Sequence, residues 1–198
     1  TKIETKAITA FNRMPSGIIG LSLCYTELQS TGDNFLSNLK RIKYLDISGN
    51  TQLNFTKNMF SEISRTLERL DARDANVRNL EWTHPLTNLR SLNLKDNKIR
   101  ILDNNSFSHM LYIQDLNLEK NSIGNWYTRL FTQNQELTTL NLRENTLTLL
   151  TEDMMEDCLS VRHLAIGKNE FECSCNLHDF MHILFEATKN ANISQLQE

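Results

Sequence analysis

The sequence has few residues that would divide the chain into separate parts. Only two prolines and six glycines occur among its 198 residues, and no low-complexity stretch acts as a linker. The formal net charge is only -3, with both signs spread along the chain, which argues against a nucleic-acid tract or a polybasic membrane patch. No apolar run approaches the ~20 residues of a membrane span, and the first residues lack the apolar region of a signal peptide. We therefore expect one sizeable domain or a run of small repeated units.

The sequence also lacks the motifs of common catalytic sites, including a phosphate-binding glycine loop, a nucleophile elbow and an HExxH motif. His178 and His182 lie one helical turn apart, with Glu186 a turn further, which is a spacing that metal ligands use. The alternative, which we favour, is the solvated polar face of a helix. We expect no catalytic residues, no metal and no cofactor, and therefore no enzyme.

An internal repeat is the dominant feature of the sequence. The pattern Leu-x-x-Leu-x-Leu-x-x-Asn-x-Ile starts at Leu89 and returns from Ile113 and from Leu137, with 24 residues between successive starts. A fourth copy starts at Val161, and looser copies start at Ile18, Ile42 and Leu67. Copies of this kind predict an α/β fold, a leucine-rich repeat solenoid. Its concave side is a curved parallel sheet and its convex side consists of irregular or helical turns.

Each recurring position in the pattern has a physical task. The leucines alternate with other residues, so they face the core while their neighbours face the concave surface. The asparagine sits where the chain leaves the strand, and its amide can satisfy backbone groups of its own and of adjacent coils. This predicts a ladder of asparagines (Asn50, Asn97, Asn121, Asn145, Asn169). Thr26 and Ala75 interrupt the ladder, and we expect local irregularity at both.

A second column lies on the return path. Ten residues after three of the asparagines comes a phenylalanine (Phe60, Phe107, Phe131), and Met155 holds the same place after Asn145. These residues predict a spine under the convex side, with Trp82 and Thr83 near that place in the shortened third repeat. Cys158 falls at a core position of its copy, and we interpret it as a buried thiol, with a disulfide as the alternative.

The two ends of the chain differ from its middle. The first fourteen residues align without gaps on residues 97–110, so we expect the chain to start within a repeat of a longer array. After Asn169 the period stops, and residues 176–189 have the spacing of a helix with one apolar face (Leu177, Phe180, Met181, Leu184). We therefore expect repeats over 1–172 and a truncated C-terminal cap over 173–198.

This end of the sequence resembles the cysteine-flanked cap of extracellular leucine-rich repeat proteins, and more closely the last repeats and cap of a Toll-like receptor ectodomain. The resemblance rests on Asn169-x-Phe171, Cys173-x-Cys175 and Asp179-Phe180. Family members commonly carry a tryptophan where this chain has Ile183. The resemblance implies that Cys173 and Cys175 bond two further cysteines downstream of this chain. The pairing of Cys24 in a longer protein stays open.

The resemblance also implies a function. The chain would be a ligand-recognition and dimerisation segment of an innate immune or developmental Toll-like receptor, which binds a protein or microbial molecule and signals when two receptors, alike or different, are brought together. It would lie on the extracellular side of the plasma membrane or in the endosomal lumen, with the membrane anchor outside this fragment. A structural or adhesive extracellular repeat protein of the matrix or neuronal type, secreted from the cell, is the alternative.

Surface positions supply the candidate sites. Sequons at Asn54, Asn104 and Asn192 agree with an extracellular setting and predict N-linked glycans. Concave-face positions beside the inward leucines give six candidate binding residues (Tyr44, Arg69, Arg73, Lys95, Glu119, Arg143). Three of them would form a modest basic zone (Arg69, Arg73, Lys95) facing Asp115 and Glu119. The alternative is a solvated sheet without a ligand.

Overall fold

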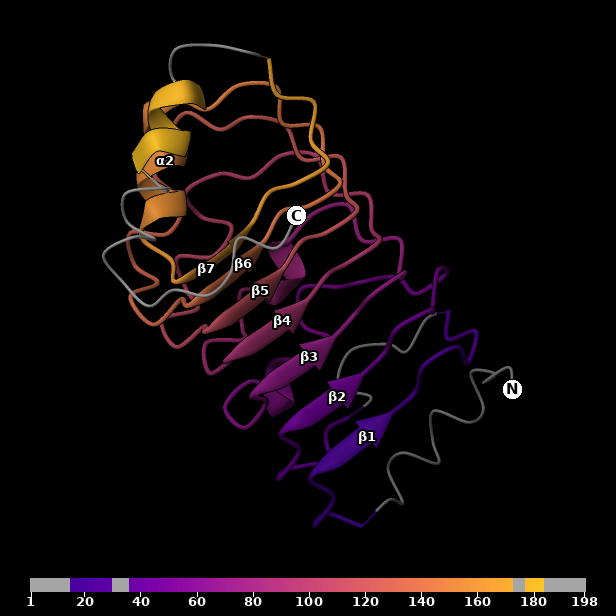
Figure 1. The fold of residues 1–198 in the computed structure, drawn as a ribbon. Coiled ribbons are helices and arrows are strands. Elements are labelled where there is room, and N and C mark those ends of the chain that lie inside the picture. The colour runs from indigo at the N-terminus through magenta and orange to yellow at the C-terminus, as the bar shows by residue number, and fades with distance from the viewer. Residues whose placement is uncertain (1–14, 30–35, 173–176, 184–198) are drawn as a thin grey trace.

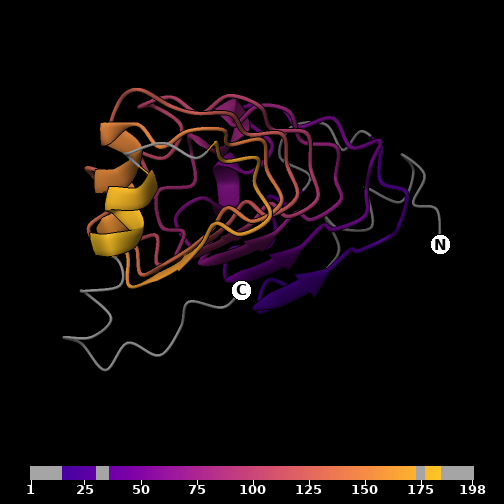
Figure 2. The same ribbon diagram turned by 45° about the horizontal axis from the view of Figure 1, so that its top comes forward.

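The computed structural model describes residues 15–29, 36–172 and 177–183. Within them, seven three-residue strands form one parallel sheet in chain order: β1 (Gly20–Ser22), β2 (Tyr44–Asp46), β3 (Arg69–Asp71), β4 (Ser91–Asn93), β5 (Asp115–Asn117), β6 (Thr139–Asn141) and β7 (His163–Ala165). The return paths contain the 3₁₀ helices η1 (Ser61–Ile63) and η2 (Glu81–Thr83) and the helix α2 (Glu152–Leu159). Figures 1 and 2 show the coils stacked in sequence order, with the strands side by side on one face.

The strand register is the one that the repeat predicts. Leu21 pairs with Leu45, Leu45 with Leu70, and the pairing continues through the central residues of the other strands (Leu92, Leu116, Leu140, Leu164). The two irregular spacings of the first half, 25 and 22 residues, are absorbed in the return paths and leave the register intact. The prediction of a leucine-rich repeat solenoid with an α/β composition is confirmed.

The asparagine ladder is also present. In Asn97, Nδ2 donates to the carbonyl oxygens of Ala72 in the preceding coil and Leu94 in its own coil, both at 2.9 Å. Its Oδ1 accepts from the backbone N–H groups of Ala75 at 3.1 Å and Val77 at 2.9 Å. The other four ladder asparagines bridge neighbouring coils in the same way (Asn50, Asn121, Asn145, Asn169). Each amide therefore ties two coils together at the point where both leave the sheet.

The two interruptions of the ladder are irregular, as expected. In every described coil the residue before the ladder position has a positive φ, which bends the chain away from the strand. At the two interrupted positions, Thr26 and Ala75, the residue after the ladder position also has a positive φ. These residues are Glu27 with φ 54° and Asn76 with φ 59°. Thr26 replaces part of the missing amide, because its hydroxyl donates to the carbonyl oxygen of Leu23 at 2.7 Å.

The convex spine is confirmed for the three phenylalanines, all of which are buried (Phe60, Phe107, Phe131). Phe107 and Phe131 stack with ring centroids 5.6 Å apart, and Trp82 of the shortened repeat packs edge-on against Phe60 at the same distance. Met155 packs against the core but is only half-buried, and the fully buried methionine of this return path is Met154. The reason is that this return path is the helix α2, whose rotation by about 100° per residue turns the neighbouring side chain into the core.

The described part of the expected cap is helical over 177–183. Phe180 is fully buried in the core cluster, and Leu177 packs against that cluster. Met181 is 47% exposed, so its placement on the apolar face is wrong. Figures 1 and 2 show this helical segment beside α2, at the end of the stack. Leu184 and the cap cysteines, Cys173 and Cys175, lie outside the described residues, and the division at residue 172 stays a prediction.

The described part of the chain contains no helix of the length and apolarity that a membrane span requires.

Candidate functional site: the concave sheet

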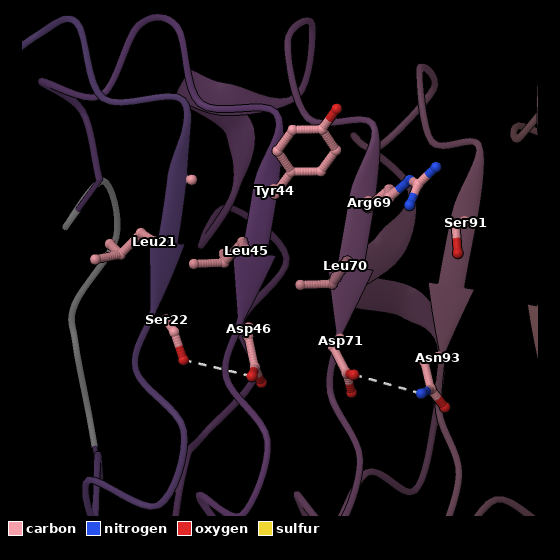
Figure 3. A pocket seen from close by; sticks show the side chains of 11 residues that line it. Leu21, Ser22, Tyr44, Leu45, Asp46, Arg69, Leu70, Asp71, Ser91 and Asn93 are labelled. Carbon is pink, nitrogen blue, oxygen red and sulfur yellow. Dashed lines mark hydrogen bonds between the residues drawn. The ribbon is translucent and has the colours of Figure 1, made fainter.

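The concave face of β1 to β4 forms a shallow groove of about 530 Å³. Because side chains alternate along a strand, the residues on either side of each central leucine face this groove. Figure 3 shows them in rows across the sheet, with Tyr44 and Arg69 on one side of the leucines and the polar row of Ser22, Asp46, Asp71 and Asn93 on the other. The short strands of four repeats thus bring residues from 20 to 93 into one site.

Tyr44 and Arg69 form the aromatic end of the groove. The guanidinium carbon of Arg69 lies 5.7 Å from the centroid of the Tyr44 ring, a distance at which the cation is attracted to the ring. Tyr44 is nevertheless 44% exposed, so much of the ring is open to solvent. The pair therefore offers a flat apolar surface and a positive charge side by side.

The polar row of the groove contains two carboxylates, Asp46 and Asp71. Ser48 lies between them, with its hydroxyl oxygen 2.6 Å from Oδ1 of Asp46 and 2.8 Å from Oδ1 of Asp71. Since a hydroxyl has one proton, Ser48 donates to one carboxylate at a time. The outer oxygens make longer contacts of 3.4 Å, Asp46 with Ser22 and Asp71 with Asn93 (Figure 3). These outer oxygens are weakly held and can accept hydrogen bonds from a ligand.

The expected basic zone is largely neutralised by its neighbours. Nε of Arg73 lies 2.9 Å from Oδ1 of Asp71, and this hydrogen bond raises the pKa of Arg73 above its ordinary value. Nζ of Lys95 lies 2.9 Å from Oε1 of Glu119, so the cation and the carboxylate that we expected to face each other across the surface are one ion pair. Two of the three cations in the zone, Arg73 and Lys95, are thus paired with carboxylates, whereas Arg69 lies over the Tyr44 ring.

The six candidate residues therefore fall into two groups. Tyr44 and Arg69 lie together in the groove. The other four lie in the next column of the concave face, one strand apart from each other (Arg73, Lys95, Glu119, Arg143), and do not line the groove. Arg143 is half-buried, and its guanidinium lies beside Gly167 of the following coil. The residues that sequence reasoning missed are Asp46 and Asp71, whose acidic column is visible in the sequence but whose link through Ser48 is not.

Comparisons with known proteins agree with this architecture. A family model described as a BspA type leucine rich repeat region matches residues 84–181 in six copies. Toll-like receptor 6 of Mus musculus is 29% identical over 175 residues, which cover 73% of this chain and 21% of that receptor. Toll-like receptor 10 of Bos taurus is 28% identical over 96 residues, covering 48% of this chain and 12% of that receptor.

Solved structures give the same result. A complex of TLR13 with ssRNA13 superposes with a TM-score of 0.62 at 25% identity, covering 72% of this chain and 20% of that one. The chain is a leucine-rich-repeat domain related to the Toll-like receptors. The leucine-rich repeat domain of APL1, at 19% identity and a TM-score of 0.61 over 70% of this chain and 37% of that one, supports the fold alone. This repeat domain spans about a fifth of the length of the Toll-like receptor 6 that it matches. The relatives are receptors and repeat domains by name, and this repeat domain is not an enzyme.

The other predicted sites of the repeat domain fall outside the groove. Asn54 and Asn104 are exposed on the return paths, where a glycan would not disturb the core, and Asn192 lies outside the described residues. His178 and His182 are both exposed, and the described residues hold no cluster of three metal-ligating side chains. Glu186 lies outside the described residues.

The thiols of the repeat domain that the structure describes are both free. Cys158 is 1% exposed, and burial raises the pKa of its thiol to about 12, so the interpretation of a buried core thiol is confirmed. Cys24 is half-buried at the rim of the concave sheet, with its sulfur 3.2 Å from the hydroxyl of Ser22.

A buried carboxylate that the sequence did not indicate fixes the convex side. Asp157 of α2 is fully buried and accepts four hydrogen bonds from the preceding coil. The donors are the indole N–H of Trp126 at 3.0 Å, Nε of Arg129 at 2.8 Å and the backbone N–H groups of Leu130 at 2.8 Å and Phe131 at 3.4 Å. No sequence signal distinguishes Asp157 from the other acidic residues of α2. Its role depends on which face of the helix meets the previous coil.

Proposed function

We propose that this chain is a ligand-recognition and dimerisation segment of the extracellular part of a Toll-like receptor. The observation that carries the proposal is the concave groove, in which the Tyr44–Arg69 pair lies opposite the carboxylates of Asp46 and Asp71. Binding sites commonly combine an apolar platform with a small number of placed polar groups. The similarity to Toll-like receptors 6 and 10 supports assigning this groove to a receptor of that family.

The groove favours a ligand with both polar and flat apolar parts. Tyr44 supplies a contact surface of the kind found at binding hot spots. The carboxylates accept hydrogen bonds from hydroxyl or amine groups, and Arg69 donates to an anionic or carbonyl group. A microbial glycoconjugate or a protein loop fits this set, and we propose that ligand binding brings two receptors together as a homodimer or heterodimer.

Several features of the proposal concern the whole protein. We propose that Cys173 and Cys175 close a cap with cysteines further along a longer chain, and that Asn54, Asn104 and Asn192 carry glycans. The receptor would be anchored in the membrane by a segment outside this fragment and would face the exterior of the cell or the endosomal lumen. A secreted structural or adhesive repeat protein is the second candidate, because such proteins share the cysteine cap on which part of the resemblance rests.

Binding to an array of microbial glycoconjugates and extracellular proteins tests the proposal. We expect at least one ligand to bind the wild-type protein and to bind Tyr44→Ala roughly tenfold or more weakly, a loss of ~1.4 kcal/mol. The control is Tyr127→Ala, which removes a tyrosine that is 68% exposed on a return path. If Tyr44→Ala and Tyr127→Ala bind the ligand equally well, the concave groove is not the binding site. A bound ligand that leaves the protein monomeric in light scattering would favour the adhesive protein.

A further inference from the structure

A second groove, of about 670 Å³, lies along the edge of the sheet where the strands begin. Residues directly before β1 to β4 contribute to it, so it is an edge of the solenoid and not part of the concave face. Five cationic side chains line it (Lys40, Arg41, Lys43, Arg65, Arg90). They come from three successive coils, so the charges are arranged along the axis of the solenoid.

The carboxylates near this edge groove leave an excess of positive charge. Lys40 pairs with Glu62 at 3.0 Å, Lys43 with Glu68 at 2.7 Å, and Arg90 with Glu136 at 3.6 Å. Five cations against three carboxylates leave two positive charges, whereas the chain as a whole has a formal charge of -3. The excess is therefore local.

Two of the five cations make no ion pair among the described residues. Arg41 and Arg65 are both exposed, and their guanidinium groups are free to contact a ligand. The three ion pairs are themselves solvent-exposed, with side-chain exposures of 60% and 43% for Lys40 and Glu62. Exposed pairs contribute little stability, so a ligand anion can compete for these cations at low cost.

The arrangement of the cations indicates a linear polyanion. Neighbouring coils of a parallel sheet are separated by about 4.8 Å, which places cations at short, regular intervals along the edge. The groove has one aromatic side chain, Tyr112, and the guanidinium carbon of Arg90 already lies 5.8 Å from its ring centroid. Single-stranded nucleic acids depend on stacking of bases on free aromatic rings. The edge groove therefore suits a polyanion that is held by its charges alone.

We propose that the edge groove binds a linear sulfated polysaccharide, with Arg41 and Arg65 as the main contacts to sulfate groups. Guanidinium groups donate two parallel hydrogen bonds to oxyanions of this kind. The described sequons at Asn54 and Asn104 follow strands β2 and β4 along the return path, so glycans at these asparagines would leave this edge open. The polysaccharide site is separate from the concave groove, and either can fail without the other.

Heparin oligosaccharide of eight sugar units is the probe, compared with its fully desulfated form by titration calorimetry at several salt concentrations. We expect Arg41→Gln/Arg65→Gln to weaken binding tenfold or more and to reduce the slope of log K against log salt by roughly two, because two counterion-releasing contacts are lost. The matched control is Arg78→Gln/Arg100→Gln, which removes two exposed arginines from a different groove, on the return paths.

Three results would overturn the proposal. The first is that both double variants bind heparin equally well, and the second is that the wild-type protein binds desulfated heparin as tightly as heparin. The third is that it binds a single-stranded oligonucleotide of equal charge more tightly than heparin, which would identify a nucleic-acid site instead. Circular dichroism of each variant keeps a folding defect distinct from a binding defect. If the double variant unfolds, Arg65→Gln alone takes its place, with an expected loss of about threefold or more and a slope change of roughly one.

Discussion

Asp157→Ala removes the buried carboxylate that joins α2 to the preceding coil. The side chain of Asp157 is fully buried, and three of its four donors, the indole N–H of Trp126 and the backbone N–H groups of Leu130 and Phe131, are buried with it. Alanine cannot accept their hydrogen bonds, and water does not reach them. The variant therefore removes the acceptor of three buried donors.

The expected loss of stability follows from these contacts. Each unsatisfied buried donor costs ~1–3 kcal/mol, which gives ~2–6 kcal/mol for Trp126 and Leu130, and the 3.4 Å bond from Phe131 is long and adds less. Arg129 adds little, because its side chain is 31% exposed and still has Glu156 as a partner. We expect the free energy of unfolding to fall by about 3–5 kcal/mol, the range for removing one partner of a buried charge pair. That is a large part of the ~5–15 kcal/mol typical of a folded domain.

Urea unfolding, monitored by far-ultraviolet circular dichroism, measures this loss. The change in free energy is the shift in the urea midpoint multiplied by the dependence of the free energy on urea concentration. The matched control is Glu156→Ala on the same helix, whose side chain is 65% exposed and, among the described residues, forms an ion pair with Arg129 alone. We expect it to lose less than ~1 kcal/mol, as exposed ion pairs do. If Asp157→Ala lowers the free energy of unfolding by no more than Glu156→Ala does, the buried carboxylate does not hold the two coils together and the reasoning is refuted.

Three further changes test other parts of the structure. Asn121→Ala should lower the free energy of unfolding by roughly 1–3 kcal/mol in the same assay, because the carbonyls of Leu94 and Leu118 lose a buried donor; a loss near zero would contradict the role of the ladder. Phe131→Ala should cost more, on the order of 3–5 kcal/mol, by opening a cavity in the spine, and a smaller loss than that of Asn121→Ala would contradict the assigned packing. Burial, together with His84 stacked 4.9 Å away, lowers the pKa of His109 below its ordinary 6.5. As the pH falls, the unfolded chain therefore binds a proton on His109 before the folded chain does. The free energy of unfolding should be highest above pH 6.5 and decline as the pH falls through the lowered pKa. In a plot of the urea midpoint of unfolding against pH, His109→Gln should remove the decline below pH 6.5. An unchanged curve would show that His109 does not contribute to the pH dependence of stability.

Most of the backbone could be predicted from the sequence, because the repeat imposes the same local geometry on every coil. The inward leucines, the asparagine ladder and the phenylalanine spine each recur at a fixed offset, and a stacked array satisfies them only in one register. The prediction was met only in part at Met155, which is half-buried against the core because the return path is a helix that turns Met154 fully inward. Met181 failed for a related reason, since the three-four spacing defines an apolar face without fixing how much of it the last coil covers.

The candidate site was predicted less completely. Tyr44 and Arg69 were found because the alternation of the strands fixes which side chains face the concave surface. Their contact across two strands, and the link of Asp46 to Asp71 through Ser48, depend on side-chain conformations that no spacing determines. How far the basic zone is neutralised could not be predicted for the same reason, because a column of charges shows the sign of each side chain but not which cations form ion pairs.

The sequence by itself determined the architecture of this protein, since leucines that alternate along each strand and an asparagine at most of the turns can be buried and hydrogen-bonded only by stacking coils. The tertiary structure alone decided where charge is free and where it is cancelled. Arg73 forms an ion pair with Asp71 two residues away, and stacking brings Lys95 within 2.9 Å of Glu119 on the next coil. Stacking gathers Arg41 and Arg65, 24 residues apart in a chain of mixed charge, on one edge, where neither forms an ion pair with a described residue. Electrostatic interaction depends on separation in space, and the stacking of the coils sets that separation.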